Sequence, residues 1–135
     1  MVGQDVVVKP MSTAEKMKVL RRRYPRPKDR ENCYVCDQWK QITEWHHAPA
    51  IEDVARLAVR VALILESKID WPMYALCPNH HAIIHTLVRH PAFKRGKMPT
   101  GALRRAGISS KAQQEAIRTI LRREAAAWRE LERLV

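Results

Sequence analysis

The spacing of cysteine and histidine constrains this chain more than any other feature of its sequence. All three cysteines and five of the six histidines fall into three short groups. The groups are Cys33-x2-Cys36, His46-His47 and Cys77-x2-His80-His81-x3-His85. Zinc binds four sulfur or nitrogen donors in a tetrahedron, and short ligand pairs can each hold one side of the ion. The sequence therefore predicts a fold organised around metal.

Two pairs with the same spacing form a complete ligand set for a structural zinc ion. We call it the Cys3His set, and its members are Cys33, Cys36, Cys77 and His80. An odd number of cysteines argues against a disulfide framework. The alternative is reduced cysteines with a chance histidine. A two-cysteine, two-histidine finger fits less well because His46 and His47 are adjacent, whereas such fingers space their histidines three to five residues apart.

The remaining histidines predict a second ion. His81 and His85 share one face of a predicted helix, whereas His80 points about 100° away, so one helix can serve two metals. His46, on the preceding predicted strand, can supply a third ligand. Strand alternation directs His47 to the other side unless the chain bends there. Three histidines with open positions are typical of a catalytic metal, which needs room for water or substrate.

Local signals predict an α+β fold that is mostly helical. Ser12 and Glu15 predict a capping box at the start of a helix over 13–23, and Pro78 suits the first turn of a helix that ends before Pro91. The other expected elements are a knuckle between short strands at 33–36, a strand over 41–46, a helix over 51–67, a strand over 73–76, a short helix within 90–107 and a final helix over about 111–134. Three regions follow: a basic helix and linker (1–32), a metal domain with an inserted helix (33–90), and a basic loop with a long helix (91–135).

Composition limits the class of protein. A chain of 135 residues, 46% of them hydrophobic, has room for one compact domain. No apolar run reaches the roughly 18 residues of a membrane span, and no secretory signal is evident at the start of the sequence. We therefore expect a cytoplasmic protein that does not enter membranes.

Positive charge is concentrated at the two ends of the sequence. The formal net charge is +11, with +5 over residues 1–40, −2 over 41–85 and +8 over 86–135. Basic flanks around a mildly acidic centre favour a polyanionic partner, most simply nucleic acid, over plain solvated surface charge. The candidate nucleic-acid contacts are Arg21, Arg22, Arg23, Arg26, Lys28, Arg30, Lys94, Arg95 and Lys97.

The order of these motifs resembles a known family. The pattern Cys-x2-Cys, then His46-His47, then Leu-Cys-Pro-Asn-His-His-Ala-Ile-Ile-His over 76–85 is similar to the zinc-stapled HNH, or ββα-metal, endonucleases. The His-His…His-x3-His pattern also resembles the nuclease domains of colicins. The resemblance spans residues 33–85 and implies a β-hairpin and one helix around a metal. It also implies that His46, His81 and His85 hold the catalytic ion and that His47 is the general base.

The sequence departs from that family at one functional position. The family usually places an asparagine nine residues before the histidine that matches His81, and it fixes the loop that carries the base. Pro72 stands at that position here, with Asp70 and Asn79 nearby as possible substitutes. The helix expected over 51–67 also replaces a segment that is normally an irregular loop.

These observations lead to one expected function and two alternatives. The first is a metal-dependent endonuclease that hydrolyses phosphodiester bonds in DNA, with Mg²⁺, Mn²⁺, Ni²⁺ or Zn²⁺ as its catalytic ion beside the structural zinc. The second is a catalytically weak or inactive zinc module of the same fold that binds nucleic acid or a protein partner. The third is a structural helper in a larger nucleoprotein machine. The apolar stripe of the final helix could pack on the domain, on a second copy in a homodimer, or on a protein partner.

Overall fold

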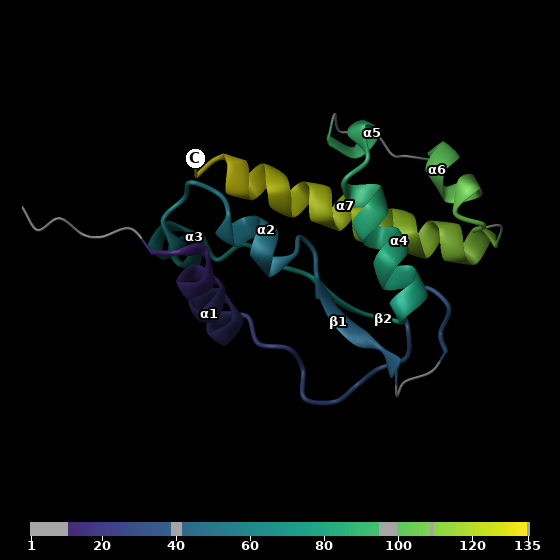
Figure 1. Cartoon of the computed structure of the whole chain (residues 1–135), viewed down its shortest axis with the longest axis horizontal. Coiled ribbons are helices and arrows are strands. Elements are labelled where there is room, and N and C mark those ends of the chain that lie inside the picture. The colour runs from purple at the N-terminus through teal and green to yellow at the C-terminus, as the bar shows by residue number, and fades with distance from the viewer. Residues whose placement is uncertain (1–10, 39–41, 95–99, 109, 135) are drawn as a thin grey trace, which may run out of the picture.

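The computed structural model describes residues 11–38, 42–94, 100–108 and 110–134. As expected, the fold is α+β and mostly helical, with a two-stranded antiparallel sheet and a long C-terminal helix (Figure 1). Among the described residues, no helix is long and apolar enough to span a membrane. The elements are α1 (Thr13–Arg23), β1 (Glu44–His47), α2 (Ile51–Ala55), α3 (Val61–Ser67), β2 (Met73–Leu76), α4 (Pro78–Val88), α5 (Pro91–Lys94), α6 (Thr100–Arg105) and α7 (Lys111–Glu132).

The helix starts follow their sequence signals. Ser12 and Glu15 form both bonds of the predicted capping box, each at 3.1 Å. Ser110 caps α7 through the backbone N–H of Gln113. Pro78 occupies the first turn of α4, where its missing N–H leaves no helical bond unmade. Local chemistry therefore sets where these helices begin.

The hairpin that carries the histidine pair begins later than expected. β1 pairs with β2 in a register that places His46 opposite Tyr74 and His47 opposite Met73. Of the predicted strand over 41–46, residue 41 lies outside the described residues, and residues 42 and 43 are not in the strand, because Ile42 lies in a helical turn and is half exposed. The Cys33–Cys36 knuckle is a turn and not a loop between strands. It docks on the sheet through the Tyr34 N–H, which donates to the Ala75 carbonyl at 2.8 Å.

The single helix expected over 51–67 is two helices, α2 and α3, with a break at 56–60. Val59 and Ile64 are both buried in one apolar cluster, yet five residues along a continuous helix would place them about 140° apart. The break lets both side chains reach the same cluster. The Lys16 ammonium donates to the Leu57 and Val59 carbonyls within the break, at 3.0 and 3.3 Å, and so replaces lost helical bonds.

Two apolar clusters hold the molecule together, and α7 contributes to both. The first packs α7 residues Ile117 and Leu121 against the hairpin and α4. The second joins α1, α2, α3 and Trp71 to Leu131 near the end of α7. At 22 residues, α7 is about 33 Å long, and Figure 1 shows it running along the molecule beside α4. The apolar stripe predicted for this helix consists of Ile117, Leu121, Trp128, Leu131 and Val135. The chain itself buries or partly buries the first four, and Val135 lies outside the described residues.

Truncation of Leu121 tests this packing. Leu121 is fully buried, so Leu121→Ala should lower the free energy of unfolding by about 2–5 kcal/mol. Leu63, a helical leucine that is 37% exposed, is the matched control, and Leu63→Ala should cost about 1 kcal/mol or less. Urea unfolding of the two variants, followed by circular dichroism, provides the comparison. Equal losses would mean that α7 does not pack on the hairpin and α4.

Candidate metal centres

The four members of the Cys3His set converge as the sequence predicts. Their donor atoms lie within 4.8 Å of one another. His80 Nδ1 is 3.6 Å from Cys33 Sγ and 3.2 Å from Cys77 Sγ, and the sulfurs of Cys36 and Cys77 are 4.0 Å apart. Two sulfurs bound tetrahedrally to one zinc ion at about 2.3 Å stand about 3.8 Å apart. The set is therefore arranged as a possible metal site that is compatible with zinc.

Backbone geometry brings the two ligand pairs together. The Cys33 carbonyl accepts from the Asp37 N–H at 2.7 Å, which closes the first turn. Asp37 adopts the left-handed conformation, at φ 55°, which aspartate tolerates better than most residues. Cys77 is the N-cap of α4, so His80 follows it within the first helical turn. The turn and the helix start thus present their side chains to the same point.

The thiols of the set differ in their ease of ionisation. Burial opposes ionisation of Cys33, but backbone N–H groups of Cys77, Cys36 and Val35 donate to its sulfur and lower its pKa overall. Burial, together with the hydrogen bond to Cys33, raises the pKa of Cys36 to about 12. A bound cation removes this penalty, because a coordinating thiol is deprotonated outright.

The second group, His46, His81 and His85, also forms as predicted. Donor atoms of the three rings lie within 4.8 Å of one another, and the Nε2 atoms of His81 and His85 are 3.0 Å apart. The ring of His46 meets each of the other two edge-on at 5.1 Å between centroids. We call this group the three-histidine set. Its imidazoles come from β1 and α4, on a different face of α4 from His80.

Glu44 orients one ring of this set. Glu44 and His46 are two residues apart on β1 and therefore share a face of the strand. A Glu44 carboxylate oxygen lies 3.3 Å from His81 Nδ1. A carboxylate that holds one ring nitrogen leaves the other, here Nε2, free to act as a ligand.

Glu124 on α7 is the residue that sequence reasoning missed. It is 1% exposed, and its Oε1 lies 3.5 Å from His46 Nε2. Within the described part of the chain, neither of these two buried atoms has a hydrogen-bond partner. Burial lowers the pKa of His46 to about 4 and raises that of Glu124 to about 7. A signal was present in the sequence: Glu124 follows Ile117 by seven residues and so falls on the apolar face of the helix.

His47 points away from the three-histidine set, as strand alternation predicts. Its ring packs edge-on against Trp71, with centroids 5.5 Å apart, and it is 5% exposed. Its Nε2 lies 2.9 Å from the Tyr24 carbonyl oxygen, which only accepts hydrogen bonds. Nε2 therefore carries the proton, and Nδ1 is the nitrogen that can accept one. Burial lowers the pKa of His47, so the ring is neutral at pH 7.

The loop after His47 is fixed without an asparagine. The Ala48 N–H donates to the carbonyl of Pro72 at 2.9 Å, and the Trp71 indole donates to the Pro49 carbonyl at 2.6 Å. The nearby acid Asp70 instead pairs with Arg123 at 3.3 Å. The segment 71–72 thus holds this loop through one backbone carbonyl and one indole.

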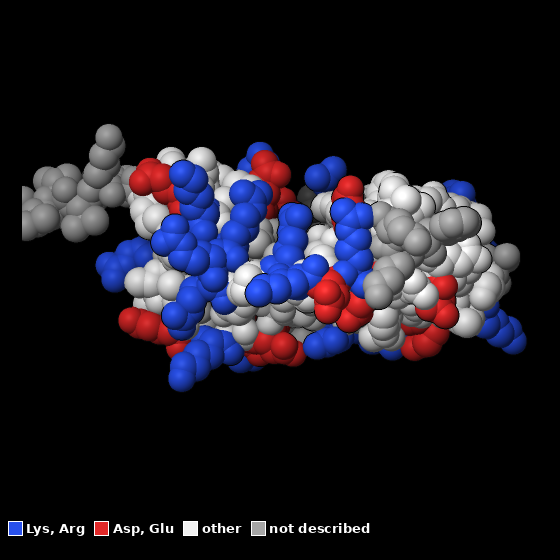
Figure 2. Space-filling model, turned by 90° about the horizontal axis from the view of Figure 1, so that it is seen from below, with Lys and Arg blue, Asp and Glu red and all other residues white. Residues whose placement is uncertain are grey.

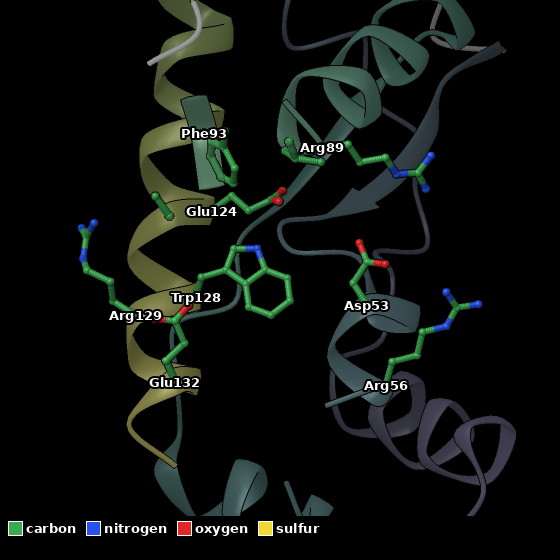
Figure 3. Close-up of a pocket in the computed structure, with 10 residues that line it drawn as sticks. Asp53, Arg56, Arg89, Phe93, Glu124, Trp128, Arg129 and Glu132 are labelled. Atoms are coloured by element: carbon green, nitrogen blue, oxygen red, sulfur yellow. The ribbon is translucent and has the colours of Figure 1, made fainter. Parts of the chain in front are cut away.

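A pocket of about 590 Å³ is lined in part by Glu124. Because Glu124 also faces His46, the pocket lies next to the three-histidine set. In Figure 3 the Glu124 carboxylate and the Trp128 indole point from α7 into the space that faces Asp53 of α2. Arg89 and Phe93 border the same space. The pocket therefore combines guanidinium donors, aromatic surface and carboxylates next to the histidines.

The predicted basic contacts form an exposed surface where they are described. They lie at the end of α1 and in the segment that follows it. Figure 2 shows lysine and arginine side chains gathered over this part of the molecule. The exposed members are Arg21, Arg22, Arg23, Arg26, Lys28 and Arg30. Lys94 ends α5 without a described side chain, and Arg95 and Lys97 lie outside the described residues.

No protein-family model matches this sequence, and no curated protein or solved structure matches it either. The interpretation of these two groups as candidate metal sites therefore rests on their donor atoms, distances and burial.

Zinc removal tests the Cys3His set. We expect the Cys3His set to hold one tightly bound zinc ion, and loss of that ion should unfold the hairpin because the ligands join elements far apart in sequence. Elemental analysis and far-ultraviolet circular dichroism before and after chelation provide the measurement. His80→Ala should lose the ion, whereas His90→Ala, outside both sets, should keep it. A chain that stays folded and zinc-free after chelation would contradict the assignment.

Proposed function

We propose that this protein is a metal-dependent endonuclease of the HNH class that hydrolyses phosphodiester bonds in DNA. One observation carries the proposal. The antiparallel hairpin and α4 surround three converging imidazoles, while the Cys3His set joins the same helix to the chain before the hairpin. This arrangement agrees with the ββα-metal unit that the sequence resembles. It combines one centre closed by four protein ligands with one that keeps open positions.

The chemistry assigns a separate task to each group. A divalent ion held by the three-histidine set would stabilise negative charge on the phosphate and on the leaving oxygen. His47 would take a proton from the attacking water at Nδ1, because Tyr24 holds its Nε2–H. A base oriented by a third group is the usual arrangement for activating a nucleophile.

DNA binding would use the positive charge near the centres. The exposed arginines after α1 supply donors for backbone phosphates, and this contact is independent of sequence. Arg89 and Arg129 line the pocket beside Glu124 and can bind a phosphate close to the ion. We therefore expect strong electrostatic binding with weak preference for base sequence.

The alternative is a catalytically weak or inactive zinc module of the same fold that binds nucleic acid or a protein partner. Its specific support is the position of His47, which is 5% exposed, packs edge-on against Trp71 and lies outside the three-histidine set. The absence of the usual asparagine at Pro72 points in the same direction. The presence of His47 directly after His46 favours the enzyme, because a scaffold has no need of a base beside a metal ligand.

Salt dependence tests the binding surface. Log affinity for duplex DNA should fall steeply with log salt, and each lost phosphate contact should flatten that slope by about 0.9. The triple variant Arg21→Gln, Arg22→Gln, Arg23→Gln should therefore show a shallower slope in fluorescence-anisotropy titrations. A double variant, Arg60→Gln with Lys68→Gln, removes exposed charge from the acidic centre and should keep the parent slope. Parent affinity that barely changes between low and moderate salt would contradict this mode of binding.

Replacement of His47 tests catalysis. His47→Ala should slow plasmid cleavage by at least about 10²–10⁴-fold and leave zinc content and DNA affinity nearly intact, because a base acts in the chemical step. His81→Ala and His85→Ala should also stop cleavage, but through loss of the second ion. The assay uses Mg²⁺, Mn²⁺, Ni²⁺ and Zn²⁺ in turn, with His90→Ala as the histidine control.

Two outcomes would count against the enzyme. If His47→Ala cuts as fast as the parent with every metal, His47 is not the base. If the parent binds DNA and never cuts it, the binding-module alternative is correct.

A further inference from the structure

We propose that Glu124 is a fourth protein ligand of the ion at the three-histidine set, so that α7 completes the centre. This inference rests on the metal site of the proposed function and adds a residue that lies 39 positions after His85 in the sequence. It would make the site His3Glu, with the carboxylate supplied by a helix outside the hairpin and α4. An ion that takes six ligands, such as Mn²⁺, would still keep two positions open for water or substrate.

The burial of Glu124 is the first argument. The side chain is 1% exposed, and Oε1 has no hydrogen-bond partner among the described residues. His46 Nε2, the atom it faces, is also buried and without a partner. An unpaired polar atom in the interior costs free energy, and a buried carboxylate costs more. One cation bound by both atoms satisfies both at once.

The distance between the two atoms is the second argument. Hydrogen bonds between nitrogen and oxygen are 2.7–3.2 Å long. Oε1 and Nε2 are 3.5 Å apart, which is too long for a good hydrogen bond. Two donors bound tetrahedrally to one ion at about 2.1 Å stand about 3.4 Å apart. The pair therefore has the spacing of two ligands on a shared ion. Glu124 is not in the group of donor atoms that all lie within 4.8 Å of one another, so a side chain of the set must shift when the ion binds all four residues.

The surroundings of Glu124 hold it in this position. Leu121 and Ala127, three residues to either side, are buried and anchor α7. Trp128 lines the same pocket, and Figure 3 shows its indole and the Glu124 carboxylate close together at the wall of that pocket. A carboxylate fixed in this way is a preorganised ligand and does not swing freely to solvent.

A carboxylate changes which ions the centre prefers. Imidazole suits nickel and zinc, whereas carboxylate oxygen suits harder ions such as manganese. Removal of the carboxylate charge should therefore weaken Mn²⁺ binding more than Ni²⁺ binding. A role for Glu124 in packing alone would weaken both ions to the same extent.

Calorimetric titration of the full chain, with zinc already in the Cys3His set, tests the proposal. Glu124→Gln keeps the shape of the side chain and should weaken Mn²⁺ binding at least about tenfold, with a smaller loss for Ni²⁺. Glu130→Gln is the control, because Glu130 is exposed on the same helix, and it should match the parent. Crystals of the parent loaded with Mn²⁺ give a second measurement that needs no variant. They should place Oε1 about 2.2 Å from the ion.

Each outcome has a distinct meaning. If the parent binds a second ion and Glu124→Gln binds Mn²⁺ equally well, Glu124 is not a ligand and the three-histidine centre stands. If Mn²⁺ in the crystal lies more than about 3 Å from Oε1, the inference is also wrong. A parent that binds no second ion overturns both the inference and the proposed catalytic centre. None of these measurements uses DNA cleavage, so an inactive parent would contradict the proposed function without bearing on Glu124.

Discussion

The contact between the Cys33–Cys36 turn and the start of α4 organises the rest of the fold. This contact brings three sulfurs and one imidazole within 4.8 Å of one another. The turn is joined to the hairpin by the hydrogen bond from the Tyr34 N–H to the Ala75 carbonyl. With this end of α4 fixed, the next residue, His81, turns about 100° towards β1 and meets His46. Placement of the second set of ligands therefore depends on the first. This dependence explains how a short helix can present two possible metal-binding groups on different faces.

Much of this arrangement could be predicted from the sequence because it depends on short-range spacing. The separation of Cys77 from His80 and of His81 from His85 fixes which side chains share a face of α4, whatever else surrounds the helix. The capping box at Ser12 and the proline at the start of α4 are equally local. Strand alternation correctly separated His46 from His47, since neighbouring residues on a strand face opposite ways.

The features that the sequence did not reveal depend on contacts between distant segments. The break between α2 and α3 exists because Val59 and Ile64 must reach one cluster, and no local signal marks that requirement. The hydrogen bond from the Trp71 indole to the Pro49 carbonyl, in the loop after His47, can be predicted only when the register of β1 and β2 is known. Glu124 reaches His46 only because α7 packs along the molecule, although an acid on the apolar face of a helix was a visible signal. Such positions become predictable only once the packing of α7 is known.

Native mass spectrometry of the zinc-loaded chain tests most directly whether α4 carries two ions on two faces. After excess metal has been removed, the parent should retain the mass of two ions per chain. A variant with both His81 and His85 replaced by alanine should retain one, because the Cys3His set is intact. A parent with a single ion, or a double variant that still holds two, would contradict a metal centre at His46, His81 and His85.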